Sequence, residues 1–190
     1  MDNNALSILD THELLSITRW QLDQGQFGQA LIYAKHLLAR GDAPIEAQRL
    51  AAKIYAQLGL FDHAKTAFKT FIEQSPDALT EIFQYGMVHY DSGNSEEAVT
   101  IWKDVLDKET TYPPALFYSA LALANQDKAS ESLRYLDVLI KSAPSDNLYF
   151  ERGRQLMKAI EQNKQAPVIE DTEDQRKLEK YKNSDDRIIN

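Results

Sequence analysis

Four positions at a constant spacing of 34 residues constrain what this chain can fold into. Gly25, Gly59 and Gly93 are followed, at the same interval, by Asp127. A fixed period of about 20 to 50 residues indicates a stack of supersecondary units that bury their apolar faces against one another. We therefore predict a repeat architecture, in which the place of a residue within its repeat predicts the face that it occupies.

Other positions keep the same spacing. A small residue recurs five positions after each marker, at Ala30, Ala64, Ala98 and Ser132. An apolar residue recurs nine positions after it, at Ala34, Phe68, Trp102 and Leu136, and again twelve positions after it, at Leu37, Phe71, Val105 and Leu139. These recurrences indicate four helix-pair repeats of the same design.

The runs "GQFGQA" at 25–30 and "GLFDHA" at 59–64 have a Gly-x-aromatic-x-x-Ala pattern that resembles the tetratricopeptide repeat family. The third run, "GNSEEA" at 93–98, has Ser95 at the aromatic position, and the fourth has Asp127 and Ser132 in place of Gly and Ala. The resemblance covers roughly residues 11–146. It implies an all-α, right-handed superhelical solenoid of antiparallel helix pairs with a concave groove that binds partners.

The register predicts the helices and the domain organisation. The first helix runs from Asp10, which has capping-box spacing to Glu13, to the turn at Gly25. Later helices are predicted over about 27–39, 45–58, 61–74, 79–92, 95–109, 113–125, 128–142 and 147–162. We predict one solenoid domain over residues 1–163, with repeats at about 11–44, 45–78, 79–112 and 113–146. A capping helix at about 147–163 covers the last repeat, as solenoids require.

Residues 164–190 are charge-dense and poor in core residues, which predicts a mobile tail. Thr172 and Gln175 have capping-box spacing, so a short helix at 172–182 is also predicted. Leu178 and Tyr181 would share one face of that helix. Two interpretations stay open: the tail docks in the groove of its own or a neighbouring copy, which allows self-association, or it only aids solubility.

Net charge and composition limit the function classes. The net charge of −8 and pI near 5.0 argue against nucleic acid and anionic membrane surfaces as partners. The chain has no cysteine, no apolar run of about 18 residues and no basic, apolar leader at its start. We therefore expect a cytoplasmic protein without a membrane span.

The resemblance implies that certain positions of the first helix in each repeat line the groove. In the first two repeats these positions carry basic residues, Arg19, Arg49 and Lys53. In the last two they carry aromatic and apolar residues, namely Phe83, Met87, Tyr90, Phe117, Tyr118 and Leu121. One interpretation is a binding site for a peptide or helical segment with apolar anchors and an acidic end. The other is that the aromatic residues pack between helices and the basic residues are solvated.

The sequence contains no motif for catalysis, metal binding or cofactor binding. It has no G-x-S-x-G, P-loop or G-x-G-x-x-G, and the four histidines fall at unrelated repeat positions. We expect both Trp20 and Trp102 to lie in the core. The predicted function is therefore a non-catalytic scaffold, adaptor or assembly factor that binds a protein or peptide. Alternatives are a secretion-type chaperone for an exported client, a self-assembling structural protein and, remotely, a hydrolase using groove carboxylates.

Overall fold

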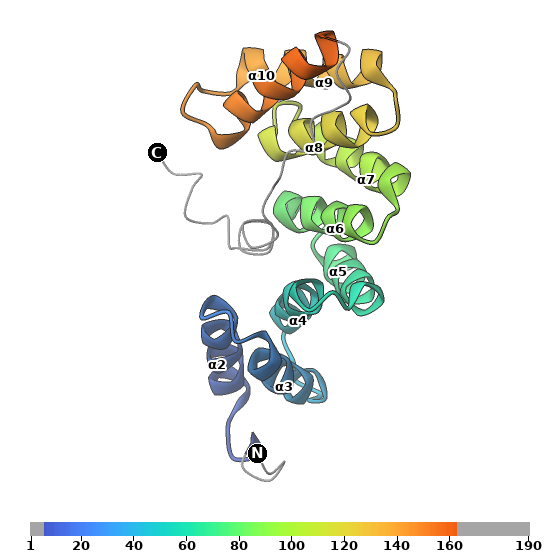
Figure 1. Ribbon diagram of the computed structural model, residues 1–190. Coiled ribbons are helices and arrows are strands. Elements are labelled where there is room, and N and C mark those ends of the chain that lie inside the picture. The colour runs from blue at the N-terminus through green and yellow to red at the C-terminus, as the bar shows by residue number, and fades with distance from the viewer. Residues whose placement is uncertain (1–5, 163–190) are drawn as a thin grey trace. The chain divides into compact units, whose positions relative to one another are not determined.

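The computed structural model describes residues 6–162 and confirms the all-α prediction over that range (Figure 1). Nine helices lie within these residues, and none of residues 6–162 is in a strand. The helices are α2 (Thr11–Asp23), α3 (Phe27–Leu38), α4 (Ile45–Gln57), α5 (Phe61–Gln74), α6 (Leu79–Asp91), α7 (Ser95–Lys108), α8 (Pro113–Ala124), α9 (Ala129–Ser142) and α10 (Leu148–Glu161). The predicted ranges of α3 to α10 agree with these bounds to within one residue at either end. The predicted helix at 172–182, like the rest of the tail, falls outside the described residues.

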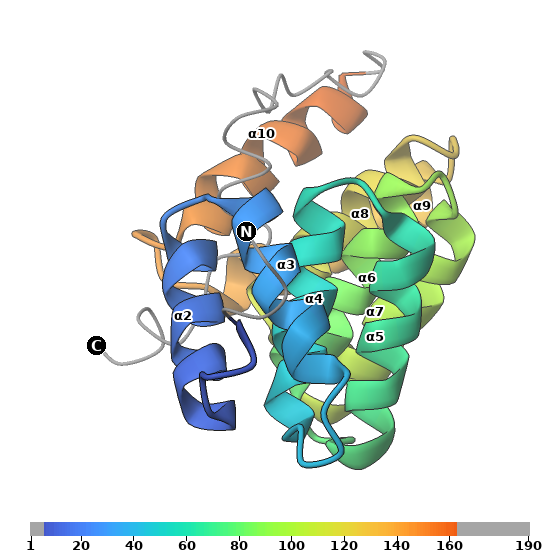
Figure 2. The ribbon, with the colours of Figure 1, turned by 90° about the horizontal axis from the view of Figure 1, so that it is seen from below.

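The described chain divides into two compact units, residues 6–81 and residues 82–162. In the first unit, α3 packs against both α2 and α4, and α4 pairs with α5 (Figures 1 and 2). The first turn of α6 also belongs to this unit. In the second unit, α8 packs against α7, α9 and α10. Each unit is a set of antiparallel helices from consecutive repeats.

The four markers of the 34-residue period share one backbone conformation. Gly25, Gly59 and Gly93 have φ angles of +70°, +70° and +85°, and Asp127 has a φ of +59°. Each of these residues ends the turn after a repeat's first helix, where a left-handed residue reverses the chain. Glycine adopts this conformation without steric cost, and aspartate is among the few other residues that tolerate it. The loss of glycine in the fourth repeat therefore leaves the turn intact.

The small residue five positions after each marker is buried in every repeat. Ala30, Ala64, Ala98 and Ser132 are all fully buried. The serine in the fourth repeat needs a partner for its hydroxyl, and its Oγ donates to the carbonyl oxygen of Ala120 at 2.7 Å. Ala64 and Ala98 are thus buried, as residues at close helix–helix contacts must be.

The start of α2 is fixed by the predicted capping box. The Asp10 side chain accepts from the Glu13 backbone N–H at 2.8 Å, and the Glu13 carboxylate accepts from the Asp10 N–H at 2.8 Å. Leu9, just before the cap, packs against the small core that Leu14 forms with Leu37 and other residues of the first unit. The capping box and the packing of Leu9 together fix the start of the first repeat.

Trp102 lies in the core, as predicted. It is fully buried, and its Nε1 donates to the backbone carbonyl of Phe83 at 3.1 Å. The indole lies against Gly86, where a Cβ atom would come within 2.3 Å of Trp102 Nε1. A glycine in the middle of α6 therefore makes room for the largest side chain of the second unit.

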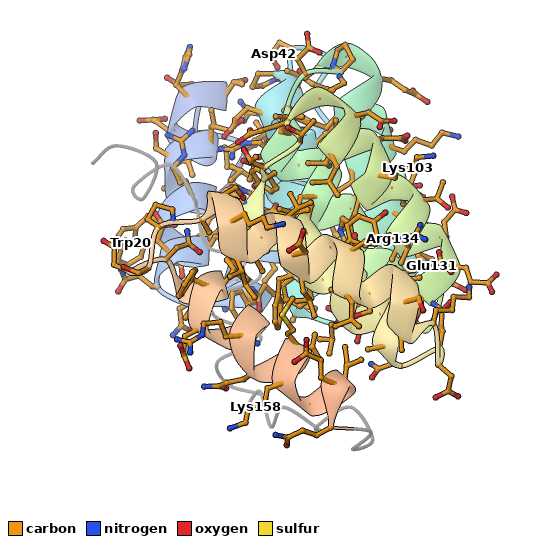
Figure 3. All side chains as sticks on the ribbon, turned by 90° about the horizontal axis from the view of Figure 1, so that it is seen from above. Trp20, Asp42, Lys103, Glu131, Arg134 and Lys158 are labelled. Atoms are coloured by element: carbon orange, nitrogen blue, oxygen red, sulfur yellow. The ribbon has the colours of Figure 1, made fainter. Side chains whose placement is uncertain are left out.

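The prediction for Trp20 is wrong, because 59% of this residue is exposed. Figure 3 shows its side chain pointing away from α2. The residues at the same place in the next three repeats, Ile54, Val88 and Ala122, are all fully buried. Among the described residues no earlier repeat packs on α2. The repeat period predicts a neighbouring repeat on both sides of every repeat, and this prediction fails for the first one.

Helix α10 covers the last repeat, as predicted for a capping helix. It packs against α8 and α9, and it buries Gly153 and Leu156. A Cβ on Gly153 would lie 2.8 Å from Leu139 Cδ2, so the glycine allows close approach to α9. The opposite side of α10 carries exposed polar residues such as Lys158, which is labelled in Figure 3.

Candidate interaction surfaces

The basic residues predicted for the first two repeats belong to one network of charges in the first unit. Arg19 of α2 lies 3.2 Å from Glu46 of α4, and Arg49 of α4 binds the same carboxylate. Arg49 also lies 3.2 Å from Glu81, in the first turn of α6. Lys53, one turn further along α4, lies 3.6 Å from Glu81. We call these five residues the charge network.

Arg49 makes the strongest contacts of the charge network. Its Nε donates to Glu46 Oε2 at 2.7 Å, and its Nη2 donates to Glu46 Oε1 at 2.5 Å. Paired bonds of this kind between a guanidinium and a carboxylate are stronger than a single contact and fix the orientation of both groups. The hydrogen bond to Glu46 raises the pKa of Arg49 above its ordinary value. Burial alone would raise the pKa of Glu46, but its bonds with Arg49 and Arg19 hold that pKa below the ordinary value.

The three predicted basic residues differ in accessibility. The Arg19 side chain is 47% exposed, the Arg49 side chain 15% and the Lys53 side chain 1%. A buried cation is stable only when it is paired and hydrogen-bonded. Glu46 and Glu81 supply that pairing for Arg49, so Arg19 is the member of the predicted set that a partner reaches without rearrangement.

The aromatic residues predicted for the last two repeats form one cluster in the second unit. The Phe83 ring lies 5.8 to 6.1 Å from the rings of Tyr112, Tyr118 and Trp102, measured between centroids. Tyr118 also contacts Tyr90, at 6.4 Å. Aromatic rings at these separations attract one another in addition to burying apolar area. The cluster joins α6, α7 and α8, and we call it the aromatic cluster.

Helix α10 extends the aromatic cluster. Tyr149 lies 5.6 Å from the ring of Phe117, and the Arg152 guanidinium lies 4.7 Å from the same ring. A guanidinium over an aromatic face is attracted by the ring's electron density. The capping helix therefore contributes an aromatic and a cationic side chain beside the first helix of the fourth repeat.

Most of the predicted apolar residues are core residues of the second unit. Phe83, Met87, Phe117 and Tyr118 are buried, whereas Tyr90 and Leu121 are half-buried. The Asn125 side chain donates to Tyr90 Oη at 3.3 Å, at the rim of the aromatic cluster. Tyr90 and Leu121 thus offer side-chain surface on a framework of buried rings. That these residues bind a peptide stays a prediction.

The binding residues predicted from the sequence did not include several residues of these surfaces. Glu46 and Glu81 neutralise the predicted basic residues, and Tyr149 and Arg152 enlarge the aromatic cluster. The Glu46–Arg49 pair has a helical i,i+3 spacing that would have revealed it. The Arg49–Glu81 pair spans 32 residues, close to but not at the repeat period, so no sequence signal marks it.

Among residues 6–162, no group of three or more His, Cys, Asp or Glu side chains is placed to hold a metal ion. Within the same range, no helix combines the length and the apolar character that crossing a bilayer requires.

Comparison with known proteins supports a repeat fold. Residues 114–146 match the profile described as tetratricopeptide repeat. No curated protein matches the sequence. The chain is similar in structure to MamA (TM-score 0.66, 15% identity, 70% of this chain and 77% of MamA covered). It is also similar to TTC0263, a thermophilic TPR protein of Thermus thermophilus (TM-score 0.62, 22% identity, 76% and 80% covered).

A third similar structure is a tetratricopeptide repeat protein from Parabacteroides merdae (TM-score 0.69, 21% identity). The match covers 82% of this chain and 60% of that protein. At these identities the likenesses concern the fold. Residues 114–146 thus match the tetratricopeptide repeat itself, and the described residues have a fold similar to that of tetratricopeptide repeat proteins.

Proposed function

We propose that this chain is a non-catalytic scaffold that binds a peptide or helical segment of another protein. The observation that carries the proposal is the arrangement of Tyr90 and Leu121, which are half-buried on the first helices of the third and fourth repeats. Interfaces concentrate their binding energy in aromatic and arginine side chains that sit on rigid, well-packed surroundings. The aromatic cluster beneath Tyr90 supplies such surroundings.

The proposed partner has apolar anchors and an acidic end. The anchors would contact Tyr90 and Leu121 in the second unit. Arg19, in the first unit, is by itself an exposed cation that suits an acidic group. Phe83, Met87, Phe117 and Tyr118 are buried, and of these Tyr118 contacts the ring of Tyr90. An adaptor and a secretion-type chaperone would use the same surface and differ in the client. In either role the protein acts where its client is folded or assembled, and we place that in the cytoplasm.

Site-specific photo-crosslinking tests this proposal. Benzoylphenylalanine replaces Leu121 on α8 in one variant and Val138 on α9 in a matched control, in which an exposed apolar residue of a second helix is replaced. Each variant is irradiated in native lysate, and the crosslinked proteins are identified by mass spectrometry. We expect a defined set of proteins to crosslink at 121 and not at 138. The same set at both positions, or proteins at 138 alone, would refute the proposal.

A further inference from the structure

The Glu46 carboxylate lies between two arginines. Its Oε1 accepts from Arg19 Nη2 at 3.2 Å and from Arg49 Nη2 at 2.5 Å. The two guanidinium groups come from different helices, α2 and α4, and converge on one oxygen. The geometry of an acid-binding site is therefore present, with an acid of the chain itself in it.

The two arginines hold Glu46 unequally. Arg49 makes a second bond to the carboxylate, through Nε at 2.7 Å, and is further held by Glu81. Arg19 makes one longer bond, and its side chain is 47% exposed. An exposed ion pair with a single contact contributes little to stability, because water screens it and ordering two side chains costs entropy. The Arg19–Glu46 contact is thus the one that an incoming group can replace cheaply.

We propose that Glu46 is an internal competitor for acidic ligands and sets the selectivity of the first unit for them. This inference rests on the proposed function and names the chemistry of one part of the partner, a carboxylate side chain. The carboxylate takes over Arg19 while Glu46 stays on Arg49. A guanidinium has five N–H donors, so Arg19 can bind such a group through two parallel bonds instead of one.

With Glu46 as an internal competitor, Arg19 would distinguish between different acidic ligands. A ligand with one weak negative group gains no net binding free energy by displacing Glu46 from Arg19. A segment with closely spaced acidic side chains does gain binding free energy from this exchange. Selectivity then comes from an unfavourable exchange for the wrong ligand as much as from attraction to the right one. The chain's net charge of −8 repels acidic segments elsewhere and adds to this discrimination.

The test uses a defined probe, the peptide acetyl-Glu-Glu-Glu-amide, with acetyl-Gln-Gln-Gln-amide as its neutral counterpart. Binding is followed by NMR of the arginine Nε–Hε signals in the full chain at constant ionic strength. The variants are Glu46→Gln and a matched control, Glu73→Gln, which removes an exposed acid of α5 outside the charge network. Both variants change the net charge equally, so only the local competition differs between them.

We expect the Arg19 signal of the wild type to move saturably with the glutamate peptide and not with the glutamine peptide. The dissociation constant should fall about three- to tenfold in Glu46→Gln and stay unchanged in Glu73→Gln. Arg19→Gln should abolish the tightening that Glu46→Gln produces, whereas Lys35→Gln, the loss of an exposed cation on α3, should leave it. The backbone amide spectrum of each variant reports whether it is folded.

Equal dissociation constants in wild type, Glu46→Gln and Glu73→Gln would overturn the inference. A movement of the Arg19 signal that sodium chloride reproduces would do so as well. Neither result affects the crosslinking test at Leu121, which concerns the second unit. Conversely, absence of crosslinks at 121 leaves the competition at Arg19 measurable, so the two proposals fail separately.

Discussion

Replacing Gly86 by alanine places a methyl group where Trp102 lies. The added Cβ would be 2.3 Å from Trp102 Nε1 and 2.7 Å from its Cδ1, distances at which the indole has to move. Moving it strains the hydrogen bond from Nε1 to the Phe83 carbonyl, now 3.1 Å long, and the ring's contacts in the aromatic cluster. The substitution therefore sets overpacking and a weakened buried hydrogen bond against the better helix propensity of alanine.

The magnitudes favour destabilisation. Overpacking a close-packed core costs about 1–3 kcal/mol. A buried donor left without its acceptor costs about 1–3 kcal/mol more. Alanine in place of glycine within a helix raises the free energy of unfolding by about 1 kcal/mol, because of its higher helix propensity. The net expectation is a loss of about 1–5 kcal/mol in the free energy of unfolding of the second unit.

Urea unfolding followed by tryptophan fluorescence measures this loss. The background variant Trp20→Phe leaves Trp102 as the sole tryptophan, since the chain has two. The matched control is Gly28→Ala on α3, where a Cβ would meet nothing within 4 Å. We expect Gly86→Ala to lower the unfolding midpoint and shift the emission of Trp102, and Gly28→Ala to leave both unchanged or raise the stability slightly. A Gly86→Ala variant as stable as its parent, with unchanged emission, would refute the packing described for Trp102.

Three further expectations concern the repeat register and the charge network. Ala64→Leu should destabilise the first unit by about 1–3 kcal/mol through overpacking, measured by urea unfolding; unchanged stability would count against the register. Asp127→Gly should preserve or raise stability, whereas Asp127→Val should lower it by about 1–2 kcal/mol because a branched side chain resists positive φ; equal melting temperatures of the two variants would contradict the turn geometry. The depressed pKa of Glu46 stabilises the fold above its unfolded pKa, and this contribution is lost as pH falls through the folded value. Stability should therefore fall less between about pH 5 and pH 3 in Glu46→Gln than in wild type, by thermal unfolding, and parallel curves would argue against the pairing.

The fold was predictable because its two strongest local constraints recur in every repeat. A left-handed turn needs glycine or a tolerant substitute such as Asp127, and a close helix contact needs a small residue such as Ala98. Both requirements leave a mark on the sequence at a fixed spacing. Helix bounds follow from them, since each turn ends one helix and begins the next.

Accessibility was harder to predict than position. Trp20 has the same place in its repeat as Ile54, yet it is exposed because burial depends on the neighbouring repeat and not on the residue itself. Lys53 has a position that the family resemblance assigns to the groove, yet only 1% of its side chain is exposed. Its carboxylate neighbour, Glu81, comes from the next repeat, and no local pattern predicts such a pair.

The central claim is that partners bind the first helices of the repeats. It is tested most directly by the affinity of a crosslinked partner, once identified, for two variants that place the same charge on opposite helices. Leu121→Arg alters the first helix of the fourth repeat, and Val138→Arg alters an exposed position of its second helix. Isothermal titration calorimetry should show a dissociation constant at least tenfold higher for Leu121→Arg, which is a loss of about 1.4 kcal/mol in binding free energy. Val138→Arg should bind with wild-type affinity. Wild-type affinity for Leu121→Arg together with a loss for Val138→Arg would contradict the claim and place the binding surface on the second helices.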